Sequence, residues 1–297
     1  MLNRWRDWLG WGEEGEGEAI VQPVGVAATA RVLIGLAVVA GLAGGLWWAE
    51  RELASYHAAR AVAVDEAAVV ELADRPAWMS GAVERRVTGV AAEWAEASWT
   101  RGRGLRLAAM ALAEEPWVAS VREVSRATDG RVVIEATYRR PVALVRGADA
   151  YRLVDAAGVR LPGLYAAQQA ERVGLPIVVG CVERPPAPGQ AWGSEALRGG
   201  LSLIAWVSGE VYADQIAAFD IGGRDARGRV RLVMQTVSGG RVTWGLPPGS
   251  EMAVEPIAAR KLEAVRHVHE ELGSIDAGGQ TVDVTGAQIA VTRQPTL

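Results

Sequence analysis

Residues 105–145 read LRLAAMALAEEPWVASVREVSRATDGRVVIEATYRRPVALV and carry the clearest structural pattern in the chain. Apolar residues recur at helical spacing over residues 105–112, which predicts a helix there. Residues 118–126 and 132–139 each predict a strand, and the Thr-Asp-Gly turn at 128–130 is typical of a tight hairpin. We therefore expect a helix followed at once by two paired strands.

The sequence before this stretch completes a small α+β unit. Val83, Val87 and Val90 stand at helical spacing within residues 81–97, which predicts a second helix. Residues 69–72 predict a short strand ahead of it. The resulting order of strand, helix, helix, strand, strand favours an antiparallel sheet that buries one face under the helices and leaves one edge available to a partner.

After residue 140 the chain changes to short strands with a few helices. Ser194 is expected to cap a helix running to about Val207, and Gly273 to end a helix over residues 257–272. The pattern predicts a second α+β domain with a largely antiparallel sheet. Its strands are expected at residues 142–146, 151–155, 175–180, 216–221, 230–237 and 242–246, and 281–292 forms either a last strand pair or one long strand.

An uncharged segment near the N-terminus predicts a single transmembrane helix. Residues 32–49 read VLIGLAVVAGLAGGLWWA, and at roughly 1.5 Å per residue this run nearly spans the hydrocarbon core of a bilayer. A cleaved signal peptide is the alternative, but the run is long for one and bulky aromatic residues stand where small residues should precede cleavage. The residues assigned to this anchor are Arg31, Val32, Gly41, Gly45, Trp47 and Trp48.

Composition and charge narrow the class of protein. The chain has 297 residues, 50% hydrophobic and 22% charged, which excludes whole-chain disorder and a polytopic membrane protein. The formal charge of −4 offers no excess of cations for nucleic-acid phosphates. Cys181 is the only cysteine, so neither an intrachain disulfide nor a four-cysteine zinc site can form.

The sequence offers no recognisable set of catalytic or metal-binding residues. His267 and His269 lie two positions apart on a predicted helix, whereas two ligands on one helix face need a spacing of four. No nucleophile motif or phosphate-binding loop occurs. We therefore expect no catalytic residues, no metal, no cofactor and no small-molecule substrate.

Several short motifs occur in the order found in one protein family. PWV at 116–118 leads from a helix into a strand, RRPVA at 139–143 leaves the small unit, LVDAAG at 153–158 resembles a hairpin that opens a β domain, and VDV at 282–284 resembles a strand near the end. With this architecture, the chain resembles the FtsQ/DivIB family of bacterial cell-division proteins. Thr285 stands where the family has an arginine. The residues that match the other motifs are Pro116, Trp117, Val118, Pro141, Val154, Asp155 and Gly158.

The resemblance implies a fold and an orientation. Residues 1–31 would form a cytoplasmic tail, 32–49 the transmembrane helix and 50–64 a stalk. A POTRA-like domain of strand, helix, helix, strand, strand would cover residues 65–140, and an FtsQ-type β domain residues 141–293, before a short tail at 294–297. The protein would then lie in the inner membrane at the division septum, with the two domains outside the cytoplasm.

The resemblance also implies a function. It predicts a non-enzymatic divisome scaffold that recruits FtsB/FtsL-like coiled-coil partners, together with other divisome components, and couples them to septal cell-wall synthesis. The partner would add a strand to the edge of the β domain. The residues expected at this edge are Val282, Asp283, Val284, Thr285, Gln288, Ile289 and Val291, and those expected at a second edge, on the POTRA-like domain, are Val132, Ile134 and Tyr138.

Two other functions remain open from the sequence. A POTRA-containing protein of envelope assembly or secretion would share the small domain, although no series of alternating membrane strands follows it here. An envelope hydrolase with an unrecognised site would show activity in an isolated external domain, which the absence of a nucleophile and base argues against.

Overall fold

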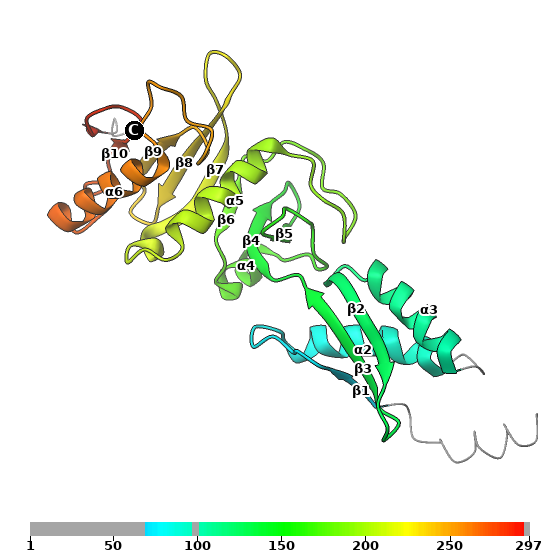
Figure 1. Cartoon of the computed structure of the whole chain (residues 1–297). Coiled ribbons are helices and arrows are strands. Elements are labelled where there is room, and N and C mark those ends of the chain that lie inside the picture. Colours follow the sequence, from blue (N-terminus) through cyan, green and yellow to red (C-terminus); the bar gives the residue numbers. More distant parts are fainter. Residues whose placement is uncertain (1–68, 97–100, 294–297) are drawn as a thin grey trace, which may run out of the picture. The chain divides into compact units, whose positions relative to one another are not determined.

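The computed structural model describes residues 69–96 and 101–293 (Figure 1). The chain divides into two compact units, residues 1–65 and 66–297, and every described residue belongs to the second. The predicted segments 1–31, 32–49, 50–64 and 294–297 lie outside the described residues. So do the residues assigned to the membrane anchor, which are Arg31, Val32, Gly41, Gly45, Trp47 and Trp48.

The first described elements form a small three-stranded sheet with two helices. The predicted order of strand, helix, helix, strand, strand is confirmed. In the sheet, the strands follow the order β1-β3-β2, with β1 parallel to β3 and β2 antiparallel to it. The elements are β1 (Val70–Leu72), α2 (Gly81–Glu96), α3 (Arg101–Glu114), β2 (Val118–Arg126) and β3 (Val132–Tyr138).

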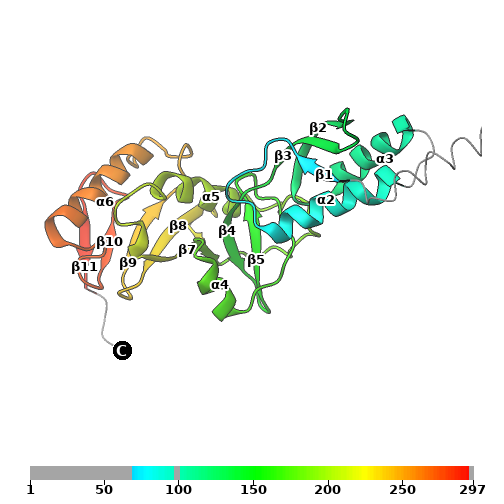
Figure 2. The same cartoon turned by 90° about the horizontal axis from the view of Figure 1, so that it is seen from below.

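Both helices pack on the same face of this small sheet (Figures 1 and 2). Val87 of α2 and Leu112 of α3 are fully buried in one core with Ile134 of β3. Helical spacing along α2 and α3 turns their apolar residues toward the sheet, as the sequence predicts. The tight turn after β2 is also present, because the Gly130 amide donates to the Ala127 carbonyl and Gly130 takes a positive φ of 93°.

The remaining strands form one large sheet of eight strands, in the order β11-β10-β9-β8-β7-β6-β4-β5. Its strands are β4 (Pro141–Arg146), β5 (Tyr151–Asp155), β6 (Ile177–Val179), β7 (Ile216–Arg224), β8 (Val230–Thr236), β9 (Arg241–Gly245), β10 (Thr281–Asp283) and β11 (Ala290–Thr292). Its helices are α4 (Ala167–Val173), α5 (Glu195–Val207) and α6 (Ala258–Leu272).

Helices α5 and α6 begin and end close to where the sequence places them, whereas α4 was not predicted. The Ser194 hydroxyl accepts a hydrogen bond from the Leu197 amide at 3.2 Å and caps α5. Gly273 takes a left-handed conformation with φ of 70° and ends α6. Both helices bury their apolar stripes in one core with the sheet, so they cover the same face of it.

The large sheet is mixed rather than largely antiparallel. The pairs β4–β6, β6–β7 and β9–β10 are parallel. A parallel pair needs a crossover connection, and helices α4, α5 and α6 lie in the three connections that join these pairs. The local strand patterns do not reveal which strands such crossovers bring together.

The predicted fold class is therefore wrong in two respects, which are the type of the large sheet and the transmembrane helix. The described residues have an α+β fold with mixed sheets. No helix within residues 69–96 and 101–293 combines the length and apolar character needed to cross a membrane. The structure does not show the transmembrane helix that the sequence predicts.

Strands β4 and β5 are buried on both faces, which explains the continuous apolar run in β4. Ala143 and Val145 face the core of the large sheet, whereas Leu144 between them belongs to the core of the small sheet. Leu153 and Val154 of β5 divide between the two cores in the same way. Successive residues of a strand point to opposite faces, so these strands join the two cores.

Candidate protein-binding edge of the large sheet

The large sheet ends at β11, the last strand of the described chain. Strand β11 pairs antiparallel with β10, with Val291 opposite Val282. Strand β10 pairs in turn with β9 in parallel. No strand within the described residues pairs with the outer side of β11, so this side presents unpaired backbone donors and acceptors.

The opposite end of the sheet, at β5, is covered by the chain itself. The Tyr151 amide donates to the Tyr165 carbonyl and the Tyr165 amide donates to the Tyr151 carbonyl, both at 2.9 Å. Further along, the Leu161 amide donates to the Leu153 carbonyl at 2.9 Å. The segment after β5 therefore satisfies the outer backbone groups of β5. Among the described strands of this sheet, β11 is left as the open edge.

The residues predicted for this edge differ in how accessible they are. Val282 and Val284 are buried in the core, and Ile289 packs against it. Val291, in contrast, has 47% of its surface exposed. The structure therefore brings the predicted residues together on one hairpin, but among its valines only Val291 is open to a partner.

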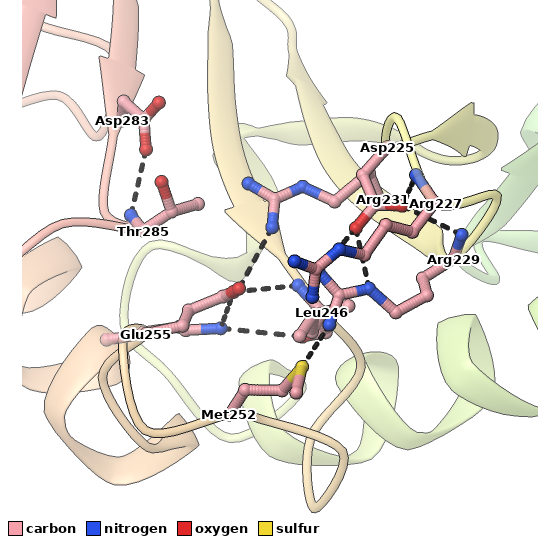
Figure 3. A network of polar contacts seen from close by, with 10 residues as sticks. Asp225, Arg227, Arg229, Arg231, Leu246, Met252, Glu255, Asp283 and Thr285 are labelled. Carbon is pink, nitrogen blue, oxygen red and sulfur yellow. Dashed lines mark hydrogen bonds and ion pairs between the residues drawn. The ribbon is translucent and has the colours of Figure 1, made fainter.

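The polar residues of the hairpin shape the turn between the two strands. The Asp283 carboxylate accepts a hydrogen bond from the Thr285 amide at 2.8 Å, as Figure 3 shows. Gln288 is exposed. Thr285 packs close to Gly245, where a side chain on Gly245 would overlap it. Thr285 thus contributes to the packing of this turn against the end of β9.

A groove of about 750 Å³ lies between α6 and the segment that joins β10 to β11. Charged residues of α6 form one side, and apolar and small residues of the joining segment form the other. The residues lining the groove are Pro256, Arg260, Glu263, Ala264, Arg266, His267, Glu270, Val284, Gly286, Ala287 and Ile289.

A buried ion pair holds α6 against the end of β9, next to the hairpin. The Lys261 ammonium is fully buried and donates to the Glu255 carboxylate at 2.6 Å. The same carboxylate accepts from the Leu246 amide at 2.7 Å and from Arg231 at 2.9 Å (Figure 3). Lys261 also lies over the Trp244 ring, 5.4 Å from its centre. Burial lowers the pKa of Lys261, while the Glu255 carboxylate opposes this change.

A second buried carboxylate fixes the segment that leads into β10. The Asp276 side chain is fully buried and accepts hydrogen bonds from the Thr236 hydroxyl at 2.6 Å, from the Ser238 hydroxyl and from the Gly278 amide. Burial alone would raise its pKa, but these hydrogen bonds lower the pKa of Asp276 to about 2. The Asp276 carbonyl also accepts from the Gln280 amide at 2.8 Å, directly before β10.

The second predicted edge, on the small sheet, is not where the sequence placed it. Strand β3 lies between β1 and β2, so Val132, Ile134 and Tyr138 belong to the central strand. All three side chains are buried. Burial and the charge of Asp74 raise the pKa of Tyr138 to about 12. The hairpin pattern identifies β2 and β3 as neighbours, but the pairing of β3 with β1 depends on a strand 62 residues earlier, since Val70 lies opposite Val132.

Apart from Pro116, the residues that match the short sequence motifs lie in the two cores, in the turn after β5 or at the start of β4. Trp117 and Val118 are buried in the small core, and Pro116 packs against Gly189. The Asp155 carboxylate accepts from the Ala157 and Val159 amides at 2.9 and 2.8 Å, and from Arg139 at 2.9 Å. These contacts hold the turn after β5, where Gly158 takes a φ of 75°. Pro141 begins β4, and Val154 lies in the large core.

The sequence prediction missed three buried charged residues beside the hairpin, Lys261, Glu255 and Asp276. A signal for Lys261 was present, because it falls on the apolar stripe of α6 together with Ala258, Leu262 and Val265. A charged residue on such a stripe is expected to have a buried partner. No comparable signal marks Glu255 or Asp276, whose partners lie on other elements.

No family model matches the sequence, and no curated protein matches it. The fold and the geometry of the edge are thus the basis for a functional proposal.

Proposed function

We propose that this chain is a non-enzymatic scaffold that binds a β-strand of another protein along β11. One observation carries the proposal: β11 ends the large sheet, and no strand of the described chain pairs with its outer side. An added strand would satisfy these backbone groups, which gives affinity, and the side chains along β11 would give specificity.

The edge strand is short, but it lacks two of the features by which proteins protect exposed strands, charge and proline. Strand β11 consists of Ala290, Val291 and Thr292, with neither a charge nor a proline. The outer strand β2 of the small sheet differs, since it carries Arg122 and Glu123 and its pairing with β3 is irregular at two places. Charges and bulges on an edge strand discourage pairing with other chains. This contrast favours β11 as the binding edge.

The class of partner follows from the resemblance to the FtsQ/DivIB family. We propose that the strand belongs to an FtsB/FtsL-like coiled-coil protein of the divisome. The chain would then hold this partner and other divisome components at the division septum and so link them to septal cell-wall synthesis.

Co-purification from dividing cells of the source organism tests the proposal. In an antiparallel pair, the amides of successive residues point alternately toward the neighbouring strand and away from it. One of the two full-chain variants Ala290→Pro and Val291→Pro therefore removes an outward donor while β10 and β11 stay paired. Circular dichroism and thermal unfolding identify the variant that keeps its fold.

We expect the native chain to capture small coiled-coil division proteins, identified by mass spectrometry, and the folded proline variant to lose them. If both proline variants fold and capture the same proteins as the native chain, strand addition at β11 is wrong. If the proteins captured through β11 belong to envelope assembly or secretion, the divisome assignment is wrong.

A further inference from the structure

A continuous row of apolar residues crosses the large sheet from β4 to β11. Each member of the row lies directly opposite the next one on the neighbouring strand, so all of them face the same side of the sheet. In spatial order the row consists of Val145, Val178, Phe219, Met234, Val242, Val282 and Val291.

Every residue of the row is buried except the one on β11. Its first six members are at most 4% exposed, and they face the core beneath α5 and α6. Val291 is 47% exposed, although it occupies the same row and the same face. The difference arises because each inner residue has neighbours on both sides, whereas Val291 has a neighbour only on β10.

The two rows beside it carry mostly polar residues where they reach β10 and β11. On one side Thr243, Asp283 and Ala290 lie opposite one another in turn. On the other side the corresponding residues are Arg241, Thr281 and Thr292. Because successive residues of a strand alternate between faces, these rows lie on the face opposite Val291.

We propose that the strand added to β11 places an apolar residue opposite Val291, with polar residues directly before and after it. This inference rests on the proposed strand addition and specifies the partner sequence: an extended segment in which an apolar residue alternates with polar ones. Val291 then determines specificity, because a polar residue opposite it would lose water without gaining a partner.

A peptide selection tests this inference without knowing the natural partner. Random 12-residue peptides displayed on phage are selected on the full chain and counter-selected on the Val291→Asp variant. Synthetic copies of the selected peptides are then titrated by fluorescence anisotropy against the native chain, Val291→Thr and two controls. Val211→Thr changes an equally apolar and more exposed side chain between α5 and β7, and Val237→Thr changes a second exposed valine, between β8 and β9.

We expect the selected peptides to share one apolar position flanked by polar ones. The added strand would bury the part of the Val291 side chain that is still exposed, and Val291→Thr would lose part of this apolar burial. We therefore expect about 5- to 10-fold weaker binding to Val291→Thr. Neither control is expected to change the affinity by more than about 2-fold.

The outcomes separate the inference from the proposed function. If peptides bind the native chain and lose binding to the folded proline variant, but show no apolar position or bind Val291→Thr equally well, the inference is wrong and strand addition stands. If no selected peptide depends on β11, both are wrong. The chain's own β11, with the sequence Ala-Val-Thr, has a similar pattern and could pair with β11 of a second copy. If sedimentation experiments show that the native chain is a dimer and that Val291→Asp dissociates it, the occupant is a second copy and the proposed foreign strand is wrong.

Discussion

Replacing Asp276 by asparagine tests whether the segment leading into β10 depends on a buried charge. The carboxylate is fully buried and accepts hydrogen bonds from Thr236 and Ser238, next to the turn between β8 and β9. Asparagine has nearly the same shape but no charge, so it removes the charge-assisted hydrogen bonds while keeping the packing.

The size of the effect follows from the pKa. The hydrogen bonds lower the pKa of Asp276 from 3.8 to about 2, and a difference of this size corresponds to about 2 kcal/mol of folding stability at pH 7. A carboxylate with a lowered pKa stabilises the fold fully above the pKa of the unfolded chain. That stabilisation is lost as the pH falls through the folded value, so about half of it remains at pH 3.

Urea unfolding of the full chain and of Asp276→Asn at pH 7, 5, 4 and 3 measures this directly. We expect the variant to be less stable by about 2 kcal/mol at pH 7, with the difference shrinking toward pH 3. Glu263→Gln, on the exposed side of α6, serves as the control and should show no such trend. A difference between Asp276→Asn and the native chain that stays constant from pH 7 to pH 3 would refute the reasoning.

Other residues give further predictions. Glu255→Gln leaves the buried Lys261 ammonium without its carboxylate and should lower the free energy of unfolding by about 3–5 kcal/mol. The double variant Glu255→Gln with Lys261→Met should lose less stability than the sum of the two single losses. Strictly additive losses would contradict the pairing of the two residues. Gly245→Ala should destabilise the chain by more than about 1 kcal/mol in urea unfolding, because Gly245 has a φ of 90° and an added Cβ would overlap the Glu255 carboxylate. Burial and the nearby Glu183 raise the pKa of Cys181 to about 11, so iodoacetamide at pH 8 should alkylate it roughly 100-fold more slowly in the folded chain than in urea; equal rates would show that the thiol is exposed.

Local elements could be predicted from the sequence because their signals are local. The turn at 128–130, the Ser194 cap and the Gly273 stop all occur where their residues predict them. Strand order could not be predicted in the same way, since it depends on residues far apart in the chain. Val132 and Ile134 show this, because the local sequence predicts an outer strand for them, whereas the pairing of β1 with β3 makes their strand the central one.

The residues predicted for a binding edge lie on one hairpin, but most of its apolar side chains are not exposed. The alternation of Val282 with Val284, and of Ile289 with Val291, indicates an apolar face on each strand, but it cannot indicate which of these residues other elements cover. Strand β9 and helix α6 bury Val282 and Val284, whereas nothing described lies beyond Val291. The exposed end of the apolar row is thus a property of the assembled sheet.

Site-specific photo-crosslinking tests the central claim most directly. The full chain is expressed in dividing cells of the source organism with benzoylphenylalanine at Ala290, at Thr292 or, as a control, at Val211, which is 83% exposed and lies outside the edge. The account predicts that Ala290 and Thr292, but not Val211, yield an adduct with the same small coiled-coil protein. Adducts of equal yield from Val211, or none from either position of β11, would contradict it.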